Sequence, residues 1–451
     1  MCGHDQLLHP PQSTRSGRRR SADIGGLSLA LGSNHGKGWL GHGTEGEATL
    51  QTRFAELLSD MYTQTLNAVN EHAANDASPD LPPETRTSLI KSLDGWNFEP
   101  NALPSEDHVA ACAVIIFEAL FRIQGMEEAV GVKLAQISPF ITHLRHIYRW
   151  QNSYHNFEHA LDVLQATYSY LRAANMVPPL SILLTQGTWK PARRPTNAAL
   201  ITLLTPPDLL ILLLAAIGHD VGHPGFTNAF MANAAAPLSV VFDGESPLER
   251  MHVALLLRVM RSCGLGGVLD GDSAPSAPPN PDSSKTPNAG KKTTRTHTKR
   301  LLVDTVLATD MRVHDAFMLR FSDLLAGRGD LSLGHKRTVL CQAIIKCADI
   351  SNPSRPYYIS QHWASALLRE WNNQAALELY HHLPPTLEGR LKEASSQMFF
   401  IPGFVKPLLD LVLRGVPEMK PYAAQCDLNL KLWTARLGIL KKNASGRKPQ
   451  P

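Results

Sequence analysis

Paired cysteines are missing from this sequence of 451 residues. Its six cysteines are scattered, and none forms a Cys-x-x-Cys motif. This spacing argues against a zinc ribbon and a disulfide framework, and it fits a reducing compartment. An N-terminal apolar stretch of the signal-peptide type is missing as well. We therefore expect a cytoplasmic protein.

Long hydrophobic runs and a strong charge of one sign are also missing. A helix that spans a bilayer needs about 20 apolar residues, and the apolar run Leu209–Ile217 is far shorter. We therefore expect no transmembrane segment. The formal net charge is only +4, and much of the excess base lies in the tails and in one loop. Charge thus gives no reason to expect nucleic-acid binding.

Strand signals are nearly absent, because no stretch alternates cleanly between apolar and polar residues and is bounded by hairpin turns. Apolar residues instead recur with helical spacing along most of the chain. The sequence therefore predicts an all-α fold. The predicted helices are Thr49–Glu71, Asp107–Arg122, Ala129–Leu134, Phe140–Trp150, Asn156–Ala173, Leu209–Asp220, Glu249–Cys263, Leu301–Leu307, Val313–Leu325, Lys336–Ile350, Ser360–Asn373, Arg390–Phe400, Pro402–Arg414 and Ala423–Lys441.

Composition divides the chain into one helical domain and two polar tails. Residues 1–48 are rich in Gly, Ser, His and Arg, and they are predicted to be a disordered tail. The helical domain is expected over 49–441, with insertions at about 176–207 and 264–300, and a polar tail follows at 442–451. The second insertion has few large apolar residues, so we expect it to be disordered too.

One polar motif follows the most apolar stretch of the chain. Leu209–Ile217 is wholly apolar, and His219, Asp220 and His223 follow it closely. Residues four apart on a helix share a face and lie about 5–6 Å apart, so the two histidines could reach one site. The pattern predicts a buried helix that ends by delivering polar groups into a pocket. A capped helix end or a solvated corner is the simpler alternative.

Further motifs offer polar groups from other predicted helices. His155 and His159 stand four residues apart on one helix, although surface helices form such pairs by chance. Asp349 ends an apolar helix just before a proline, where an ordinary C-terminal turn residue would also fit. Glu249 and His252 begin another helix, where a glutamate is common without any special role.

One site could hold His159, His219, Asp220 and Asp349 together. Two imidazoles and two carboxylates suit zinc or another borderline divalent ion. One carboxylate could also bridge to a second, harder ion such as magnesium. Two such metals activate a bridging hydroxide and clamp a phosphoryl group, which would leave His155 free as a general acid. The sequence alone does not bring these clusters together in space.

The set of motifs resembles the catalytic domain of class I 3′,5′-cyclic nucleotide phosphodiesterases. The resemblance covers roughly Asn97 to Leu437, and the motifs occur in the family's order. They are YHNFEH at 154–159, HDVGHPG at 219–225, LERMH at 248–252, ATDM at 308–311, CADISNP at 347–353 and SQMFFI at 396–401. The two predicted insertions look like those of fungal or other lower-eukaryote members.

This resemblance implies a compact multi-helix domain of the HD type that hydrolyses a 3′,5′-cyclic nucleotide to the 5′-monophosphate. Such an enzyme ends cyclic-nucleotide signalling. A metal-bridged hydroxide would attack the phosphorus, and His155 would protonate the departing O3′. The family's pattern implies zinc at the first site and magnesium or manganese at the second, with Asp220 as the bridge. The implied zinc ligands are His159, His219, Asp220 and Asp349.

The resemblance also implies residues that contact the substrate or surround the metals. Gln397 would hydrogen-bond the purine edge, and Phe400 would clamp the ring together with an aliphatic residue near Ile350. Asn352 matches a position that contacts the base in adenine-preferring members, so we expect cAMP as the preferred substrate, with cGMP as the alternative. Tyr154 joins the substrate contacts, and the surrounding shell consists of His223, Glu249, His252 and Thr309.

The chain departs from the family's pattern at two positions near the site. Gly222 stands where aspartate is common, and Met251 stands where histidine is common. Neither position is a metal ligand by this resemblance, so we expect activity to survive.

Two other functions stay open, along with the oligomeric state. The chain could be a different HD-type metal phosphohydrolase, although Gln397 and Phe400 at purine-clamp spacing argue against that. It could also be a catalytically silent nucleotide sensor, although all four proposed ligands and the general acid are present.

Overall fold

The computed structural model describes residues 61, 63–70, 81–191, 200–270, 289–387 and 389–446. These residues form helices and short turns, and the extended pairing among them is one isolated bridge between Ile123 and Trp189. The predicted all-α fold is therefore confirmed. The predicted tail 1–48 lies outside the described residues, as do 192–199, 271–288 and 447–451.

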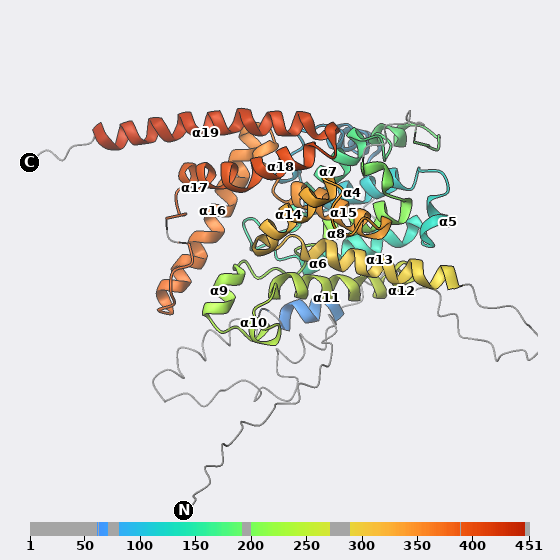
Figure 1. Cartoon of the computed structure of the whole chain (residues 1–451), viewed down its shortest axis with the longest axis horizontal. Coiled ribbons are helices and arrows are strands. Elements are labelled where there is room, and N and C mark those ends of the chain that lie inside the picture. The colour runs from blue at the N-terminus through green and yellow to red at the C-terminus, as the bar shows by residue number, and fades with distance from the viewer. Residues whose placement is uncertain are drawn as a thin grey trace, which may run out of the picture.

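The α-helices follow one another around a central pair (Figure 1). In chain order they are α3 (Pro83–Leu93), α4 (Glu106–Leu120), α5 (Met126–Val130), α6 (Ile137–Ile147), α7 (Phe157–Ala173), α8 (Pro206–Gly218), α9 (Asn228–Asn233), α10 (Pro237–Val241), α11 (Pro247–Ser262), α12 (Gly266–Asp270), α13 (Ala289–Leu307), α14 (His314–Leu325), α15 (Leu333–Asp349), α16 (Tyr357–Tyr380), α17 (Glu393–Phe400), α18 (Lys406–Leu413) and α19 (Lys420–Gly446). Short turns include the 3-10 helix η6 (Asn352–Ser354) and the π-helix η7 (Ile401–Val405).

The central pair is α7 and α8. Helix α15 packs against both of them, and α13 packs against α8. The whole run Leu209–Gly218 of α8 is buried. A helix that is apolar on every side belongs in a core. Thr205 and Asp208 form a capping box at its start, which satisfies free backbone N–H groups there. The core thus ends where the His219 motif begins.

A second group of helices consists of α16, α17 and α19. In Figure 1, α19 crosses one edge, its C-terminal half extends beyond the body, and α16 slants away from it toward α9. Helix α17 packs against both α16 and α19, and α19 packs against η6. This arrangement places Gln397 on α17 near Asn352 on η6.

The predicted break between Arg390–Phe400 and Pro402–Arg414 is wrong, because the helical run continues from Glu393 to Leu413. Pro402 has no N–H to donate, and a helix usually bends or breaks at such a residue. Here the chain passes through the π-helix Ile401–Val405, which changes the hydrogen-bond spacing locally and keeps the helix going.

The run Glu393–Leu413 is long and apolar enough to cross a membrane by length and composition, and 39% of its apolar window is buried. Core helices of other proteins meet the same criterion. Here α17 and α18 both pack against α19. Length and composition alone therefore do not show a transmembrane segment.

The predicted insertion 264–300 carries more helix than expected. Helix α12 and the first part of α13 lie within it, and Leu265, Val268 and Leu269 are buried. The hydroxyl of Thr298 donates to the Val268 carbonyl at 2.7 Å and ties the two helices together. These few apolar residues are enough to join the edges of the segment to the core, so disorder is wrong for them.

The predicted helix Ala129–Leu134 is shifted in the structure. Helix α5 covers Met126–Val130 and ends at Gly131, whose φ is +71°. Glycine adopts this left-handed conformation without strain, and it commonly ends helices for that reason. Helix α16 is longer than the predicted Ser360–Asn373 at both ends.

A buried arginine fixes the turn that follows Asp349. One terminal nitrogen of Arg355 donates to Gln165 Oε1 at 2.7 Å, and the other donates to Asp162 Oδ1 at 2.8 Å. Its guanidinium also lies 3.8 Å from the ring centroid of Trp96. Arg355 is fully buried. It therefore joins the end of η6 to α7, the helix that carries His159.

We expect Arg355→Met to lower the free energy of unfolding by about 3–5 kcal/mol, because it leaves the Asp162 carboxylate buried without its counter-charge. Urea unfolding followed by circular dichroism measures the change. Arg300→Met is the matched control: its partner Asp304 is four residues away and the Arg300 side chain is 81% exposed. That control should cost less than about 0.5 kcal/mol. Equal losses in both variants would contradict the role of Arg355.

Candidate active site

Four predicted ligands meet in one place. Helix α7 supplies His159, the turn after α8 supplies His219 and Asp220, and the end of α15 supplies Asp349. The Nε2 atoms of His159 and His219 both lie 3.3 Å from Asp349 Oδ1. The same two atoms lie 3.7 Å and 3.1 Å from Asp220 Oδ2. The structure thus brings together residues that the sequence separates by up to 190 positions.

A helix cap fixes the backbone that carries His159, and a hydrogen bond orients the His219 ring. The Asn156 side chain caps α7 by accepting from the His159 backbone N–H at 3.0 Å. His219 Nδ1 pairs with the Ala216 carbonyl at 2.9 Å, so this nitrogen carries the proton and Nε2 offers a lone pair. The Nε2 atoms of both histidines are buried and have no hydrogen-bond partner among the described residues.

The charges of this cluster call for a cation. Burial opposes a charge on His219, but the Asp220 and Asp349 carboxylates outweigh it and raise the pKa of His219 well above its usual value. Burial also opposes charge on Asp349, but the nearby imidazoles of His159 and His219 outweigh it and lower the pKa of Asp349. The buried Asp220 carboxylate and the partly buried Asp349 carboxylate thus favour positive charge at the site, either as protons or as a metal ion.

A second cluster adjoins the first through Asp220. The ligand atoms of Asp220, His223 and His252 lie within 4.8 Å of one another. Asp220 Oδ1 is 3.7 Å from His252 Nε2, whereas Asp220 Oδ2 faces His219. His252 Nδ1 pairs with the Val221 carbonyl at 2.8 Å, which again leaves Nε2 as the open nitrogen. The two oxygens of Asp220 therefore face two neighbouring clusters.

The residues present fit divalent cations. The first cluster offers two unpartnered imidazole nitrogens and two carboxylates, which is a donor set suited to a borderline ion. The second cluster shares the Asp220 carboxylate, so a neighbouring cation could be bridged through it.

The geometry around His223 differs from the prediction. Helix α8 ends at Gly218, so His219 and His223 do not share a helix face. Gly222 has a φ of +75° and forms the turn that brings His223 back. A Cβ at Gly222 would lie 2.6 Å from Leu255 Cδ1. This tight packing accounts for glycine at the position where the family's pattern has aspartate.

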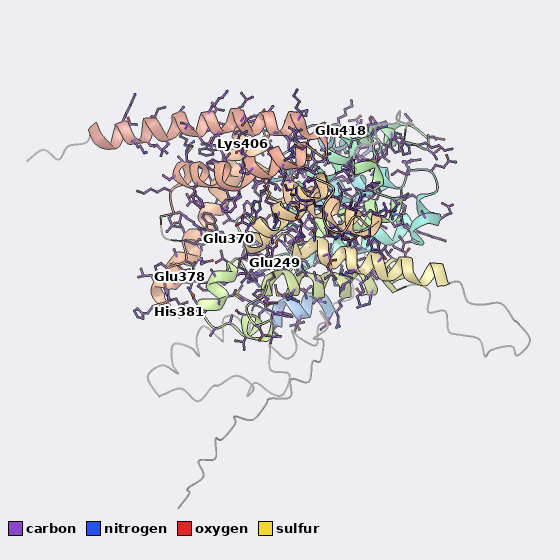
Figure 2. All side chains as sticks on the ribbon, viewed as in Figure 1. Glu249, Glu370, Glu378, His381, Lys406 and Glu418 are labelled. Carbon is purple, nitrogen blue, oxygen red and sulfur yellow. The ribbon has the colours of Figure 1, made fainter. Side chains whose placement is uncertain are left out.

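His155 lies before α7 rather than on it, because the helix begins at Phe157 after the Asn156 cap. Its ring stacks on His223 with centroids 3.9 Å apart and an angle of 17° between the planes. Glu370 on α16 hydrogen-bonds to His155 Nδ1 through Oε1. The other oxygen, Oε2, accepts from the backbone N–H groups of Tyr154 and His155 at 3.0 and 3.2 Å. Glu370 lies where α16 faces the body of the molecule (Figure 2).

The pair of His155 and Glu370 is charged at neutral pH. Burial by itself lowers the pKa of His155, but the charge and hydrogen bond of Glu370 outweigh it and raise that pKa to about 9. Burial likewise raises the pKa of Glu370, but the charge of His155 and the hydrogen bonds lower it to about 2. His155 is therefore a protonated imidazole beside the cation clusters.

A pocket of about 190 Å³ adjoins the clusters. All four predicted substrate contacts line it: Tyr154, Asn352, Gln397 and Phe400. The Tyr154 ring centroid lies 4.5 Å from that of His159, so the pocket reaches the first cluster. Further lining residues that the sequence did not suggest are Met311, Trp363, Leu367, Trp371 and Phe404. Ile350 does not line the pocket, and the aliphatic wall is provided by Leu367 instead.

The side-chain amide of Asn352 has its nitrogen in a hydrogen bond and its oxygen without one. Its Nδ2 donates to the Tyr154 hydroxyl at 2.6 Å. Its Oδ1 is buried and has no hydrogen-bond partner among the described residues. An unpaired acceptor in a pocket wall is costly unless a ligand satisfies it.

The remaining predicted residues lie around the clusters at differing distance. Both oxygens of Glu249, labelled in Figure 2, accept from Asn228 Nδ2 at 3.1 and 3.0 Å. Burial, followed by the charge of Asp310, raises the pKa of Glu249 to about 7. Thr309 donates its hydroxyl to the Val306 carbonyl at 2.8 Å, and no hydrogen bond joins it to either cluster in the described part of the chain.

Sequence reasoning missed Glu370, although a signal for it exists. Glu370, Gln374 and Glu378 follow one another at four-residue spacing and are buried, with exposures of 5%, 0% and 2%. Charged and amide residues are seldom buried without partners. A polar stripe of this kind within a helix that is otherwise amphipathic marks a face that meets polar groups elsewhere in the fold.

A family model described as 3′5′-cyclic nucleotide phosphodiesterase matches residues 154–426. The chain belongs to this family. The resemblance inferred from the motifs is therefore confirmed, and enzymes of this family use divalent metals. The matched residues contain all of the clusters and the pocket described above.

Individual relatives agree with this assignment. The chain is 27% identical over 362 residues to the human protein "High affinity cGMP-specific 3′,5′-cyclic phosphodiesterase 9A", covering 79% of this chain and 51% of that one. It is 25% identical to the Caenorhabditis elegans "Probable 3′,5′-cyclic-AMP phosphodiesterase pde-4", covering 77% and 47%. The chain spans about half the length of the curated relatives it matches.

Solved structures show the same fold. The crystal structure of yeast caPDE2 has a TM-score of 0.65 at 24% identity, and the match covers 92% of this chain and 81% of that one. At this level of identity the likeness concerns the fold alone.

We expect Asp349→Ala to lose its bound divalent ion, because it removes the carboxylate that faces both His159 and His219. Metal content after dialysis, measured by inductively coupled plasma mass spectrometry, gives the stoichiometry. Asp310→Ala is the matched control, since Asp310 is buried but bonded to Ser246 and Arg312 outside the clusters. Stoichiometric metal in Asp349→Ala would remove Asp349 from the ligand set.

Proposed function

We propose that this chain hydrolyses purine 3′,5′-cyclic nucleotides to 5′-monophosphates, with cAMP preferred. The observation that carries the proposal is the pair of buried His and Asp clusters sharing Asp220 beside a pocket lined by Gln397 and Phe400. A cyclic phosphate needs a nucleophile, compensation for developing charge and a proton for the leaving oxygen. Metal ions held by these clusters would supply the compensating charge and activate a water as the nucleophile, and His155 would supply the proton.

Zinc would be held by His159, His219, Asp220 and Asp349, and magnesium or manganese would share Asp220. Such a metal pair supplies positive charge for the phosphoryl group and lowers the pKa of water. The lone pairs at Nε2 of the two histidines and the paired carboxylates support this ligand set. The Ala216 carbonyl would hold the His219 ring in place by its hydrogen bond to Nδ1, on the side of the ring away from the metal.

His155 would act as the general acid. Glu370 engages Nδ1 of its ring, so the proton to be transferred is the one on Nε2. The pKa of about 9 keeps the imidazole charged at neutral pH. Two backbone hydrogen bonds to Glu370 fix the segment that carries the ring. Proton transfer to O3′ as the P–O bond breaks would give the free 3′-hydroxyl.

The pocket would hold the purine. Phe400 and Leu367 offer apolar surface to the faces of the ring, and Gln397 offers both a donor and an acceptor to its edge. Asn352 Oδ1 is an acceptor in the wall without a hydrogen bond among the described residues. The amino group at C6 of adenine is a donor and would satisfy it, whereas guanine has the O6 acceptor at that position.

The names of the relatives do not decide the base, since one is cGMP-specific and another is a probable cAMP enzyme. The preference for cAMP therefore rests on Asn352, whose amide is oriented by the Tyr154 hydroxyl.

We expect the purified, metal-loaded chain to hydrolyse cAMP with a higher kcat/KM than cGMP. Asn352→Leu removes the open acceptor, so kcat/KM for cAMP should fall by about tenfold, the value of one hydrogen bond. Turnover of cGMP should change less and serves as the internal control. Coupled detection of the 5′-monophosphate measures both rates. Equal rates for both nucleotides would keep the hydrolysis and discard the base preference, whereas turnover of neither would overturn the function.

We expect His155→Asn to lower kcat by about 10²- to 10⁴-fold, the usual contribution of a general acid, while metal content stays the same. In the wild type, kcat should fall as the pH rises through about 9, because His155 loses the proton it must donate. Glu370→Gln removes the carboxylate charge that keeps this proton, so the fall should begin at lower pH.

Glu378→Gln is the control for this pH effect, since Glu378 lies on the same buried stripe of α16 but contacts Gln374 and Thr386 instead. Its pH profile should match the wild type. An unshifted profile in Glu370→Gln would show that Glu370 does not set the protonation of His155.

A further inference from the structure

A second pocket, of about 320 Å³, shares no lining residue with the substrate pocket. It lies between the start of α4, the end of α6 and the start of α7. Val109, Tyr148 and Phe157 give it buried apolar walls. Its polar lining residues include Glu106, Arg145, His146, Trp150 and Glu158.

Glu158 is a carboxylate of this pocket without a counter-charge. It makes no hydrogen bond or ion pair in the part of the chain that the structure describes, although it is half-buried. Arg145 does not supply a counter-charge to Glu158. The Nη1 atom of Arg145 instead lies 3.1 Å from Asp107 Oδ1 and 4.0 Å from Glu106 Oε2.

Trp150 adds an open aromatic surface to the same pocket. Its side chain is 79% exposed, and no ring or cation contact is found for it among the described residues. An indole offers a large apolar surface together with an N–H donor, and such side chains are enriched at binding interfaces. The face of an indole attracts cations more strongly than that of any other side chain.

We propose that this pocket binds an organic cation. Its charged nitrogen would lie between the Glu158 carboxylate and the Trp150 ring, and its apolar body would lie against Val109 and Phe157. A carboxylate beside an aromatic ring is the chemistry that recognises alkylammonium and quaternary ammonium groups. The pocket size is in the range of small-molecule sites, about 300–1,000 Å³.

An occupant of this pocket would touch residues that support the first metal cluster. The Tyr148 hydroxyl donates to the Ile217 carbonyl at 2.9 Å and accepts from the Asp220 backbone N–H at 3.3 Å. Asn156, another lining residue, caps the helix that presents His159.

Isothermal titration calorimetry of the full, metal-loaded chain with benzyltrimethylammonium tests the proposal. We expect saturable binding at one site. Trp150→Ala and Glu158→Gln should each weaken the affinity by about threefold or more, the usual size of a cation–π or exposed ion contact. Both positions are at least partly exposed, so the fold should be kept, and circular dichroism checks that it is. Glu128→Gln, an exposed carboxylate outside the pocket wall, is the matched control and should bind as the wild type does.

Three results would overturn the proposal. The first is the absence of saturable binding by benzyltrimethylammonium. The second is tighter binding of phenylacetate or of benzyl alcohol than of the cation. Phenylacetate tests for an anion site, because Arg145 Nε is buried without a partner among the described residues and could attract an anion instead. Benzyl alcohol tests whether the apolar ring alone accounts for binding. The third is loss of binding in Phe400→Ala but not in Trp150→Ala, which would place the cation in the substrate pocket.

Discussion

A buried carboxylate and a partly buried carboxylate beside two buried imidazoles impose the constraint on which the site depends. Asp220 and Asp349 lie 3.1–3.7 Å from the Nε2 atoms of His159 and His219. Negative charge removed from water is costly unless positive charge compensates it. Protons on the histidines can provide this charge, and the carboxylates accordingly raise the pKa of His219. A divalent ion meets the demand better, because it leaves the imidazoles neutral and uses their lone pairs.

The same constraint accounts for the position of the site in the fold. The ligands come from α7, the end of α8 and the end of α15, which pack on one another in the core. Ligands on packed helices are held more precisely than ligands on loops. At the end of α8, backbone carbonyls orient the imidazole rings. The Ala216 carbonyl pairs with His219 Nδ1, and the Val221 carbonyl pairs with His252 Nδ1.

The sequence predicts those parts of the site that a short motif contains, and it misses those that only tertiary structure creates. The predicted α7 ends at Ala173, as found, and its motif places His159 correctly. His155 and Glu370 are 215 positions apart, so no local pattern pairs them. The sequence also did not predict the turn at Gly222. The four-residue spacing of His219 and His223 is typical of one helix face, but α8 ends at Gly218 before either residue. The preference for cAMP drawn from Asn352 stays a prediction.

One short segment, 148–159, links the proton donor to the metal cluster. Tyr148 contacts the Asp220 backbone, Asn156 caps the helix of His159, and His155 lies between them. Glu370 holds this segment by its backbone as well as by the His155 ring. A general acid is effective only when its proton lies within hydrogen-bond reach of the leaving oxygen. Because one stretch of backbone sets the acid and supports two metal ligands, a displacement of that stretch would alter proton transfer and cation binding together.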